Sequence, residues 1–207
     1  MYKQDGGNVY FLRHCTTPWN EEKRIQGVAL GMPLNPAGLK EAGGLVAVFQ
    51  DADIDEILST DARRGTQVAN LIAEAKGLKI KTWEDLREID WGELEGKLYR
   101  EVLPNHPNPQ VGDIIQFLLN YDGSGETPQQ REQRARRVKD KLLINPHQDK
   151  LVVFHGTFGL YVTCAVDNEP VTFRPEYILK NGHFHQYRIV DGKFILKGLN
   201  LKTPIKD

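Results

Sequence analysis

Two short segments of the chain, 9–12 and 151–154, are apolar at every position and rich in β-branched and aromatic residues. A strand with this pattern must be covered on both faces, which is typical of the middle of a parallel sheet between two layers of helices. Further strands are expected at 54–58, 78–82, 185–190 and 193–196. The last two flank Asp191-Gly192, a dipeptide that predicts a β-hairpin.

Segments with helical patterns separate these strands. They are expected at 36–49, 61–75, 109–120, 127–143 and 158–166. Strands that alternate with helices favour an α/β fold, and we predict a three-layer α/β/α sandwich with a mostly parallel central sheet. No repeat or linker divides the chain, so residues 1–207 are expected to form one domain. Segment 98–125, rich in Pro, Asn and Gly, is expected to be an excursion over the sheet that shapes the substrate pocket.

The composition argues against several classes of protein. Lys and Arg number 27 against 28 for Asp and Glu, and the net charge of −1 provides no general attraction for nucleic acid. No apolar run approaches the roughly 18 residues of a membrane helix, and the polar N-terminus lacks a signal segment, so we expect no membrane partner and a cytoplasmic location. Cys15 and Cys164 are too few for a disulfide framework or a four-thiolate zinc site.

A histidine follows each of the two central strands. Arg13-His14 follows the first strand, and His155 follows the second. Ligands of open α/β sheets bind outside the carboxyl ends of the strands. The strand at 54–58 leads into 59–61, expected to supply helix N-cap oxygens, and Arg64 then falls in the first helical turn. A single histidine here is usually structural, but two arginines and two histidines together predict an anion site of phosphoryl size.

Five motifs in order resemble those of the histidine phosphatase superfamily, which includes cofactor-dependent phosphoglycerate mutases and many phosphomonoesterases. They lie at 12–20 with 24–27, at 59–67, at 86–88 with 91–96, at 125–127 and at 155–157. The phosphate arginine of the second motif aligns with Arg64 and not with Arg63. Two departures are evident: Cys15 stands where the family usually has glycine, and 27–34 is one residue longer than usual.

The resemblance implies a phosphohistidine mechanism without a metal or cofactor. His14 would attack phosphorus as a neutral imidazole, which divides one displacement into two easier steps. Preorganised donors would hold the charge on the transferring oxygens. The residues expected to bind phosphate or substrate are Arg13, Asn20, Gln26, Gly27, Arg64, His155 and Gly156. Glu88 would protonate the leaving alkoxide and then activate the attacking water.

Other interpretations of these residues were weighed against that one. Without the motif, Glu88 would be a solvated carboxylate in an acidic loop. A cysteine phosphatase needs an arginine six positions after its cysteine, where this chain has Glu21 and Pro170. His183 and His185 share a strand face and could hold a metal, but solvent-facing or hydrogen-bonded histidines are favoured. The basic segment 131–139 could touch nucleic acid, although a solvated helix face is favoured.

We therefore expect a metal-independent phosphomonoester hydrolase that acts on a small phosphorylated molecule through phosphohistidine on His14. One alternative is a phosphoglycerate mutase-type phosphotransferase, which returns the phosphoryl group to bound product. The chain is shorter than expected of such mutases, which favours hydrolysis. A second alternative is a non-catalytic phospho-ligand binder, which only Cys15 favours.

Overall fold

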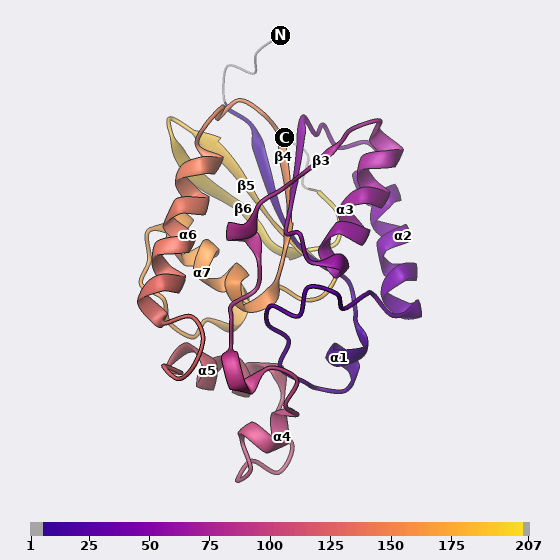
Figure 1. Ribbon diagram of the computed structural model, residues 1–207. Helices are drawn as coiled ribbons and strands as arrows, with labels where there is room; N and C mark the ends of the chain where they lie inside the picture. Colours follow the sequence, from indigo (N-terminus) through magenta and orange to yellow (C-terminus); the bar gives the residue numbers. More distant parts are fainter. Residues whose placement is uncertain (1–5, 205–207) are drawn as a thin grey trace.

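The computed structural model describes residues 6–204, whose centre is a six-stranded sheet (Figure 1). Residues 1–5 and 205–207, which include part of the polar N-terminus and both ends of the predicted domain, lie outside the described residues. The strands are β1 (Asn8–Arg13), β2 (Glu56–Ser59), β3 (Ile80–Thr82), β4 (Lys150–Phe154), β5 (Phe184–Val190) and β6 (Lys193–Leu201). Their order is β3-β2-β4-β1-β5-β6. The first four in that order are parallel, and β5 pairs antiparallel with both β1 and β6.

Both faces of the central strands are covered, as their continuous apolar character predicts. The longer helices are α2 (Pro36–Gln50), α3 (Arg63–Lys76), α5 (Val111–Leu119), α6 (Pro128–Leu142) and α7 (Gly156–Asp167). Val9 and Phe11 of β1 belong to the core cluster that includes residues of α6 and α7. Tyr10 and Leu12 of the same strand belong to the cluster formed with α2 and α3. Figure 1 shows these helix pairs on opposite sides of the sheet, which confirms the predicted α/β sandwich.

The N-terminus of α3 differs from the prediction. Its N-cap is Ala62, which provides no side-chain hydrogen bond, so the expected capping by 59–61 is wrong. The polar side chains of that segment have other partners. Asp61 forms an ion pair with Arg87, and the Thr60 hydroxyl lies 3.1 Å from a ring nitrogen of His155. The segment is therefore held by contacts to neighbouring loops, while Gly77 in the left-handed conformation ends the helix.

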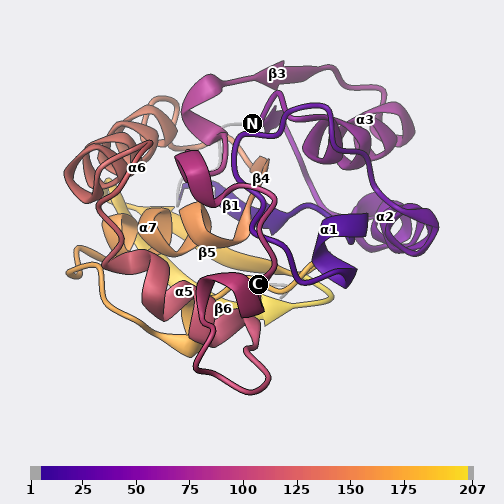
Figure 2. The same cartoon turned by 60° about the horizontal axis from the view of Figure 1, so that its bottom comes forward.

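Segment 98–125 lies over the carboxyl ends of the strands, and Figure 2 views it from that end. It contains α5 and the short helix α4 (Tyr99–Val102), and the neighbouring α1 (Pro18–Glu21) is equally short. Single 3-10 turns cover Glu84–Leu86, Gly92–Leu94 and Pro175–Tyr177. Gly125 has a φ of +100°, and a Cβ there would lie 2.4 Å from the Asp90 carbonyl oxygen. This close approach ties the end of the excursion to the segment that carries Glu88.

Two arginines of the basic segment 131–139 are buried, so its description as a solvated helix face is wrong for them. The Arg131 guanidinium donates to the backbone oxygens of Leu118, Tyr121 and Glu126. Arg134 forms a bidentate ion pair with Glu126 and also donates to two backbone carbonyls of 85–87. These side chains fasten the excursion and the Glu88 segment to α6, because backbone carbonyls that lack a helix partner need buried donors.

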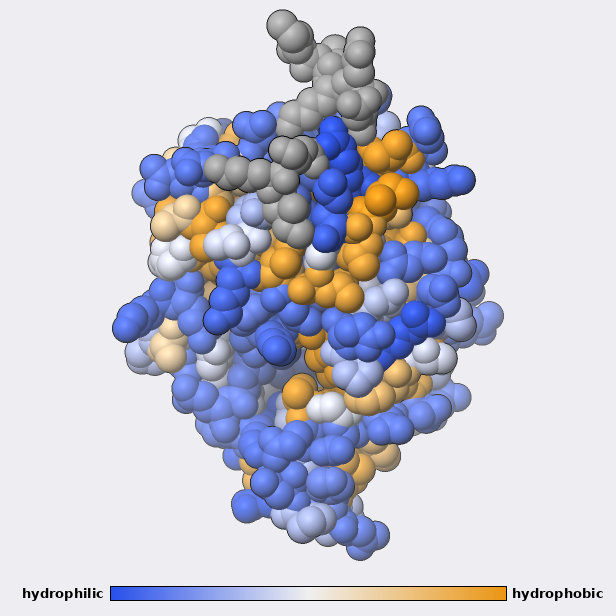
Figure 3. Space-filling view, turned by 180° about the vertical axis from the view of Figure 1, so that it is seen from behind, coloured by the Kyte–Doolittle hydropathy of each residue, from blue (hydrophilic) through white to orange (hydrophobic). Residues whose placement is uncertain are grey.

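The far edge of the sheet is formed by β6, on the side of the molecule that Figure 3 presents. Ile195 and Leu196 are half-exposed there, and Figure 3 shows apolar patches between hydrophilic ones. Lys193 and Lys197 belong to the same strand, and charged side chains on an edge oppose pairing with another strand. Within residues 6–204, none of the helices is long and apolar enough to cross a membrane.

Candidate functional site

The register of the sheet brings the two histidines together. Arg13 at the end of β1 pairs with Phe154 at the end of β4, so His14 and His155 leave the sheet side by side. Their ring centroids are 5.2 Å apart. Both rings are almost fully buried, and the predicted convergence of two strand ends is therefore present.

His14 is held in one tautomer. Its Nδ1 donates to the Cys15 carbonyl oxygen at 2.8 Å, since a carbonyl can only accept, and this leaves the lone pair on Nε2. Burial lowers the pKa of His14 well below its usual value, and the charges of Arg64 and Arg13 lower it further. The ring is therefore neutral near pH 7 with a free nitrogen, which is the form that a nucleophile requires.

His155 faces the site with its other nitrogen. Its Nε2 lies 3.1 Å from the Thr60 hydroxyl, which also accepts from the Ala62 backbone N–H. If the hydroxyl donates to Nε2, the proton of the neutral ring sits on Nδ1. That Nδ1 is buried and has no hydrogen-bond partner within the described chain. Burial lowers the pKa of His155 well below its usual value, with Arg64 adding to the effect.

The two arginines are each held by backbone carbonyl oxygens. Arg13 donates through Nη1 to Leu179, and Arg64 donates through Nη1 to Ala29 and through Nη2 to Gly27. In both side chains Nε is buried without a partner among the residues described. Burial lowers the pKa of Arg64 to about 10, so the guanidinium remains charged at neutral pH. Gly156 packs against Arg13, whose Cζ would lie 2.8 Å from a Cβ at that position.

The loop after β1 supplies two amides. Thr17 caps α1, and the Asn20 side-chain oxygen accepts from the Thr17 backbone N–H and hydroxyl. Gln26 accepts from the same hydroxyl through Oε1, while its Nε2 is buried without a partner in residues 6–204. Both amides line the pocket that contains His14. Three predicted site residues, Gly27, Arg64 and His155, are not in the lining of that pocket. The Gly27 carbonyl oxygen holds Arg64, and the His155 ring packs against His14.

Four buried side-chain nitrogens of the predicted site therefore lack a hydrogen-bond partner in the described chain. They are the Nε atoms of Arg13 and Arg64, Nδ1 of His155 and Nε2 of Gln26. Leaving a buried donor unpaired costs about 1–3 kcal/mol, and more for a charged group. Such a cluster is stabilised by a ligand with several acceptor oxygens. A phosphoryl group supplies those oxygens together with the negative charge that two guanidinium groups favour.

Glu88 lies at the N-terminus of α7 and is only 6% exposed, so the alternative of a solvated carboxylate is wrong. Its carboxylate accepts from the backbone N–H groups of Ile89, Thr157 and Phe158 at 2.8–3.0 Å. The last two are among the first N–H groups of α7, which no helix carbonyl can satisfy. The helix therefore fixes the carboxylate at the wall of the pocket that contains His14.

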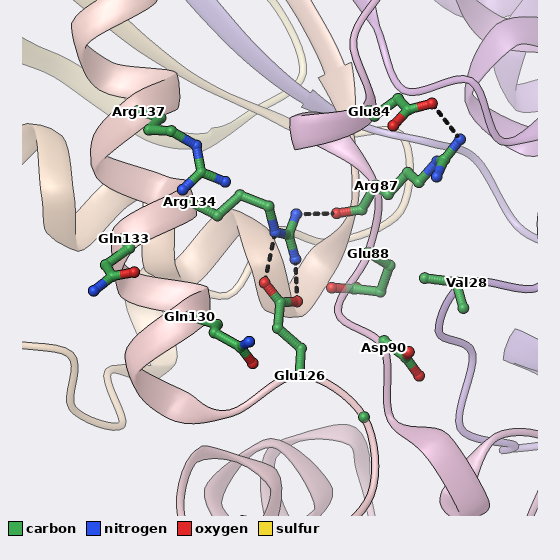
Figure 4. A pocket seen from close by; sticks show the side chains of 11 residues that line it. Val28, Glu84, Arg87, Glu88, Asp90, Glu126, Gln130, Gln133, Arg134 and Arg137 are labelled. Atoms are coloured by element: carbon green, nitrogen blue, oxygen red, sulfur yellow. Dashed lines mark hydrogen bonds and ion pairs between the residues drawn. The ribbon is translucent and has the colours of Figure 1, made fainter.

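Glu88 also lines a second pocket, which Figure 4 shows from close by. This cavity of about 530 Å³ lies between α6 and the segment 84–90. Its wall carries Arg134, whose guanidinium joins the Glu126 carboxylate and the Arg87 carbonyl (Figure 4). Among the described residues, Glu88 is the one that lines both this pocket and the pocket that contains His14. The carboxylate thus separates the phosphate donors from a polar, open cavity.

Three residues near the site were not singled out from the sequence. Asn181 donates to the His14 carbonyl oxygen and to the Asn20 side chain. Asn200 holds the same loop through the Lys180 N–H and two carbonyls. Glu95 accepts from the Val28 N–H beside Gly27, so it supports the loop that holds Arg64. Glu95 lies within a recognised motif, whereas Asn181-Gly182 alone indicates only a turn.

His183, just before β5, and His185, within β5, both form hydrogen bonds to the backbone. His185 is buried, with Nε2 donating to the Tyr177 carbonyl and Nδ1 accepting from the Asn200 N–H. His183 contacts the Asn181 carbonyl. The favoured interpretation of hydrogen-bonded histidines is confirmed. Residues 6–204 contain no group of three or more His, Cys, Asp or Glu side chains placed to hold a metal ion.

Cys15 points away from the phosphate donors. Its backbone φ is not positive, and its side chain is buried in the core cluster that includes residues of α2 and α3. Burial raises the pKa of the thiol to about 12, with a smaller contribution from Glu41. A thiol of this kind carries almost no thiolate at neutral pH, so it is a poor nucleophile.

We expect Cys15→Gly and Cys15→Ser to retain kcat/KM within about tenfold, or roughly 1.4 kcal/mol of transition-state stabilisation. The physical reason is that the thiol packs in the core and does not line the pocket. Steady-state kinetics with each variant, after circular dichroism has shown that it is folded, measures the effect. A loss of several orders of magnitude in folded Cys15→Ser would mean that the thiol takes part in the chemistry.

The chain belongs to the histidine phosphatase superfamily, branch 1, whose family model matches residues 9–202. Among curated relatives, the probable phosphoglycerate mutase GpmB of Yersinia pestis is 31% identical over 153 residues, which are 72% of this chain and 69% of that protein. The family predicted from the five motifs is thus confirmed, and the curated relatives include a putative phosphoserine phosphatase as well as probable mutases.

Solved structures share the fold at lower identity. YhfR of Bacillus stearothermophilus superposes with a TM-score of 0.80 at 22% identity, covering 96% of this chain and 98% of that one. The phosphoserine phosphatase of Entamoeba histolytica, solved in complex with 3-phosphoglyceric acid, gives a TM-score of 0.79 at 20% identity, covering 94% and 97%. The predicted fold class is confirmed by these neighbours.

Proposed function

We propose that this protein hydrolyses phosphomonoesters through a phosphohistidine on His14. The observation that carries the proposal is the set of four unpartnered buried nitrogens, from Arg13, Arg64, His155 and Gln26, together with a neutral His14 imidazole whose Nε2 carries the lone pair. The phosphoryl oxygens take up the donors of Arg13, Arg64, His155 and Gln26. The developing negative charge is then stabilised by groups that need no reorganisation.

The reaction has two balanced steps. In the first, Nε2 of His14 forms a bond to phosphorus as the bond to the leaving oxygen breaks, and that oxygen takes a proton from Glu88. In the second, a water oxygen attacks phosphorus as the N–P bond breaks, and the water returns a proton to Glu88. The position of Glu88 beside the pocket, fixed by the N-terminus of α7, supports this role.

A mutase runs the first step in the same way but gives the phosphoryl group back to bound product. Hydrolysis in water enriched in oxygen-18 distinguishes the two, because only hydrolysis places a solvent oxygen in inorganic phosphate. We expect one solvent oxygen per phosphate released, in the presence of a metal chelator. Transfer to a second organic molecule without free phosphate would support the mutase instead. Tight phosphate binding without turnover would support the non-catalytic binder.

A further inference from the structure

The pocket that contains His14 is too small for a whole substrate. Its free volume is about 30 Å³, the space of about two or three water molecules. Three apolar residues of α5 in its lining, Ile114, Ile115 and Leu118, are each only 2% exposed, so they close the pocket and offer no binding surface. A phosphoryl group held in this pocket therefore leaves the alcohol part of the ester to a neighbouring cavity.

A cavity of about 310 Å³ adjoins that pocket at Tyr99, which lines both. Burial raises the pKa of Tyr99, and the charges of Arg13 and Glu88 act on that pKa in opposite directions, so the phenol lies near both groups. The lining of the cavity combines apolar side chains, such as Leu98 and Pro109, with a few polar ones. Small-molecule sites have this composition and this size. The cavity is therefore the place for the alcohol part of an ester whose phosphoryl group lies at His14.

Three segments form the cavity beside Tyr99, and hydrogen bonds fasten them to one another. The Tyr99 N–H donates to the Lys23 carbonyl oxygen at 2.8 Å, which joins the start of α4 to the loop after α1. The Lys23 ammonium donates to the side-chain oxygens of Asn108 and Gln110, each at 3.3 Å. The walls thus keep their positions without a ligand, and a preformed site loses less conformational freedom when it binds one.

Two positive charges line this cavity, and no acid of the described chain is paired with either of them. Among the described residues, the Lys23 ammonium contacts only amide oxygens, and the Arg100 side chain has neither a hydrogen bond nor an ion pair. Glu22, the one acidic residue of the lining within the described chain, is paired with Arg24. Like charges beside one cavity repel each other. A bound anion relieves that repulsion and accepts charge-assisted hydrogen bonds from both groups.

We propose that the substrate is a phosphomonoester whose alcohol part runs past Tyr99 and carries a second anionic group, which Lys23 and Arg100 bind outside the pocket that contains His14. This inference rests on the proposed function. It assigns to Lys23 and Arg100 the recognition of the substrate, at a distance from the reacting phosphorus.

The second pocket, between α6 and segment 84–90, does not suit a second anionic group. Its arginines are each paired with an acid: Arg87 with Asp61, Arg134 with Glu126 and Arg137 with Asp85. An anion that entered this pocket would have to displace one of these carboxylates. The cavity beside Tyr99 requires no such exchange.

Matched esters test the inference. The probes are the phosphate monoesters of unbranched ω-hydroxy carboxylic acids of increasing length, each compared with its primary amide, which has the same shape and no charge. We expect the ratio of kcat/KM for the acid to kcat/KM for the amide to rise with length and to reach about tenfold, as two partly exposed charge pairs imply. A ratio within about twofold of one at every length would overturn the inference and leave the proposed hydrolysis intact.

Variants that remove one charge locate the anion. Arg100→Gln and Lys23→Gln should each lower the ratio by about threefold, and the double variant should bring it to within about twofold of one. The matched control is Lys97→Gln, because Lys97 is an exposed lysine close in sequence to Arg100 and does not line the cavity. It should leave the ratio unchanged. An unchanged ratio in the folded double variant, or an equal fall in Lys97→Gln, would contradict the inference.

Binding of phosphonates, which the reaction does not cleave, separates the inference from the proposed hydrolysis. Calorimetry should show that an ω-carboxyalkyl phosphonate of the favoured length binds about tenfold more tightly than its amide, and that the double variant binds the two alike. Equal affinities in the unmodified protein would overturn the anion site. A clear difference, with turnover of none of the esters, would support the anion site and overturn the proposed function.

Discussion

Glu88→Gln slows phosphoryl transfer from alkyl phosphates by about 10²–10⁴-fold, the usual contribution of a positioned acid or base. An alkoxide leaves poorly without a proton, which glutamine cannot give as a carboxyl group does. Aryl phosphates, whose leaving groups need less protonation, lose less. Single-turnover quench experiments across a leaving-group series measure this dependence.

The leaving-group dependence also controls for structural damage. Glutamine has one oxygen where Glu88 has two, so the variant also loses a hydrogen bond to the backbone of α7. That defect weakens transfer from every ester to a similar degree. Equal losses for alkyl and aryl esters would therefore reduce Glu88 to a residue that positions the helix.

Arg64→Lys is expected to lower kcat/KM by about 10²–10³, the effect of removing one preorganised donor at a developing charge. Arginine can donate to the carbonyl oxygens of Gly27 and Ala29 through its Nη atoms and still offer Nε to the phosphate. Lysine retains the charge but has a single nitrogen, so it cannot make both sets of contacts. The matched control is Arg63→Lys, because Arg63 is the preceding residue in α3 and is exposed. It should retain activity within about twofold.

Steady-state kinetics and a vanadate inhibition constant, measured for both variants, check this expectation. Vanadate affinity should fall for Arg64→Lys and stay constant for Arg63→Lys. Equal effects in the two variants would mean that general charge, and not the geometry of the Arg64 fork, supports catalysis.

The sheet could be predicted from the sequence because its central strands are apolar on both faces. Once β1 and β4 are parallel neighbours, the residues after them must meet, so the approach of His14 to His155 follows from pattern alone. Glu88 is different. Its segment is acidic and is typical of a solvated loop. The Glu88 carboxylate is nevertheless buried, because it accepts hydrogen bonds from free backbone N–H groups of a helix that begins about 70 residues later. Only the family motif indicates its position.

Contacts between distant loops account for what the sequence did not predict. Arg131 and Arg134 lie in a basic helix. No feature of the local sequence indicates that they are buried and donate hydrogen bonds to backbone carbonyls of other segments. Asn181 and Asn200 act through backbone groups, which any sequence possesses.

The central claim is that His14 carries the phosphoryl group during turnover. Rapid quench with a phosphorus-32 ester, followed by peptide mapping, tests it most directly. The account predicts an acid-labile, alkali-stable label on His14, formed and lost at rates that match turnover and absent from His14→Ala. Steady turnover with no label on His14, or a label on His155 instead, would contradict the account.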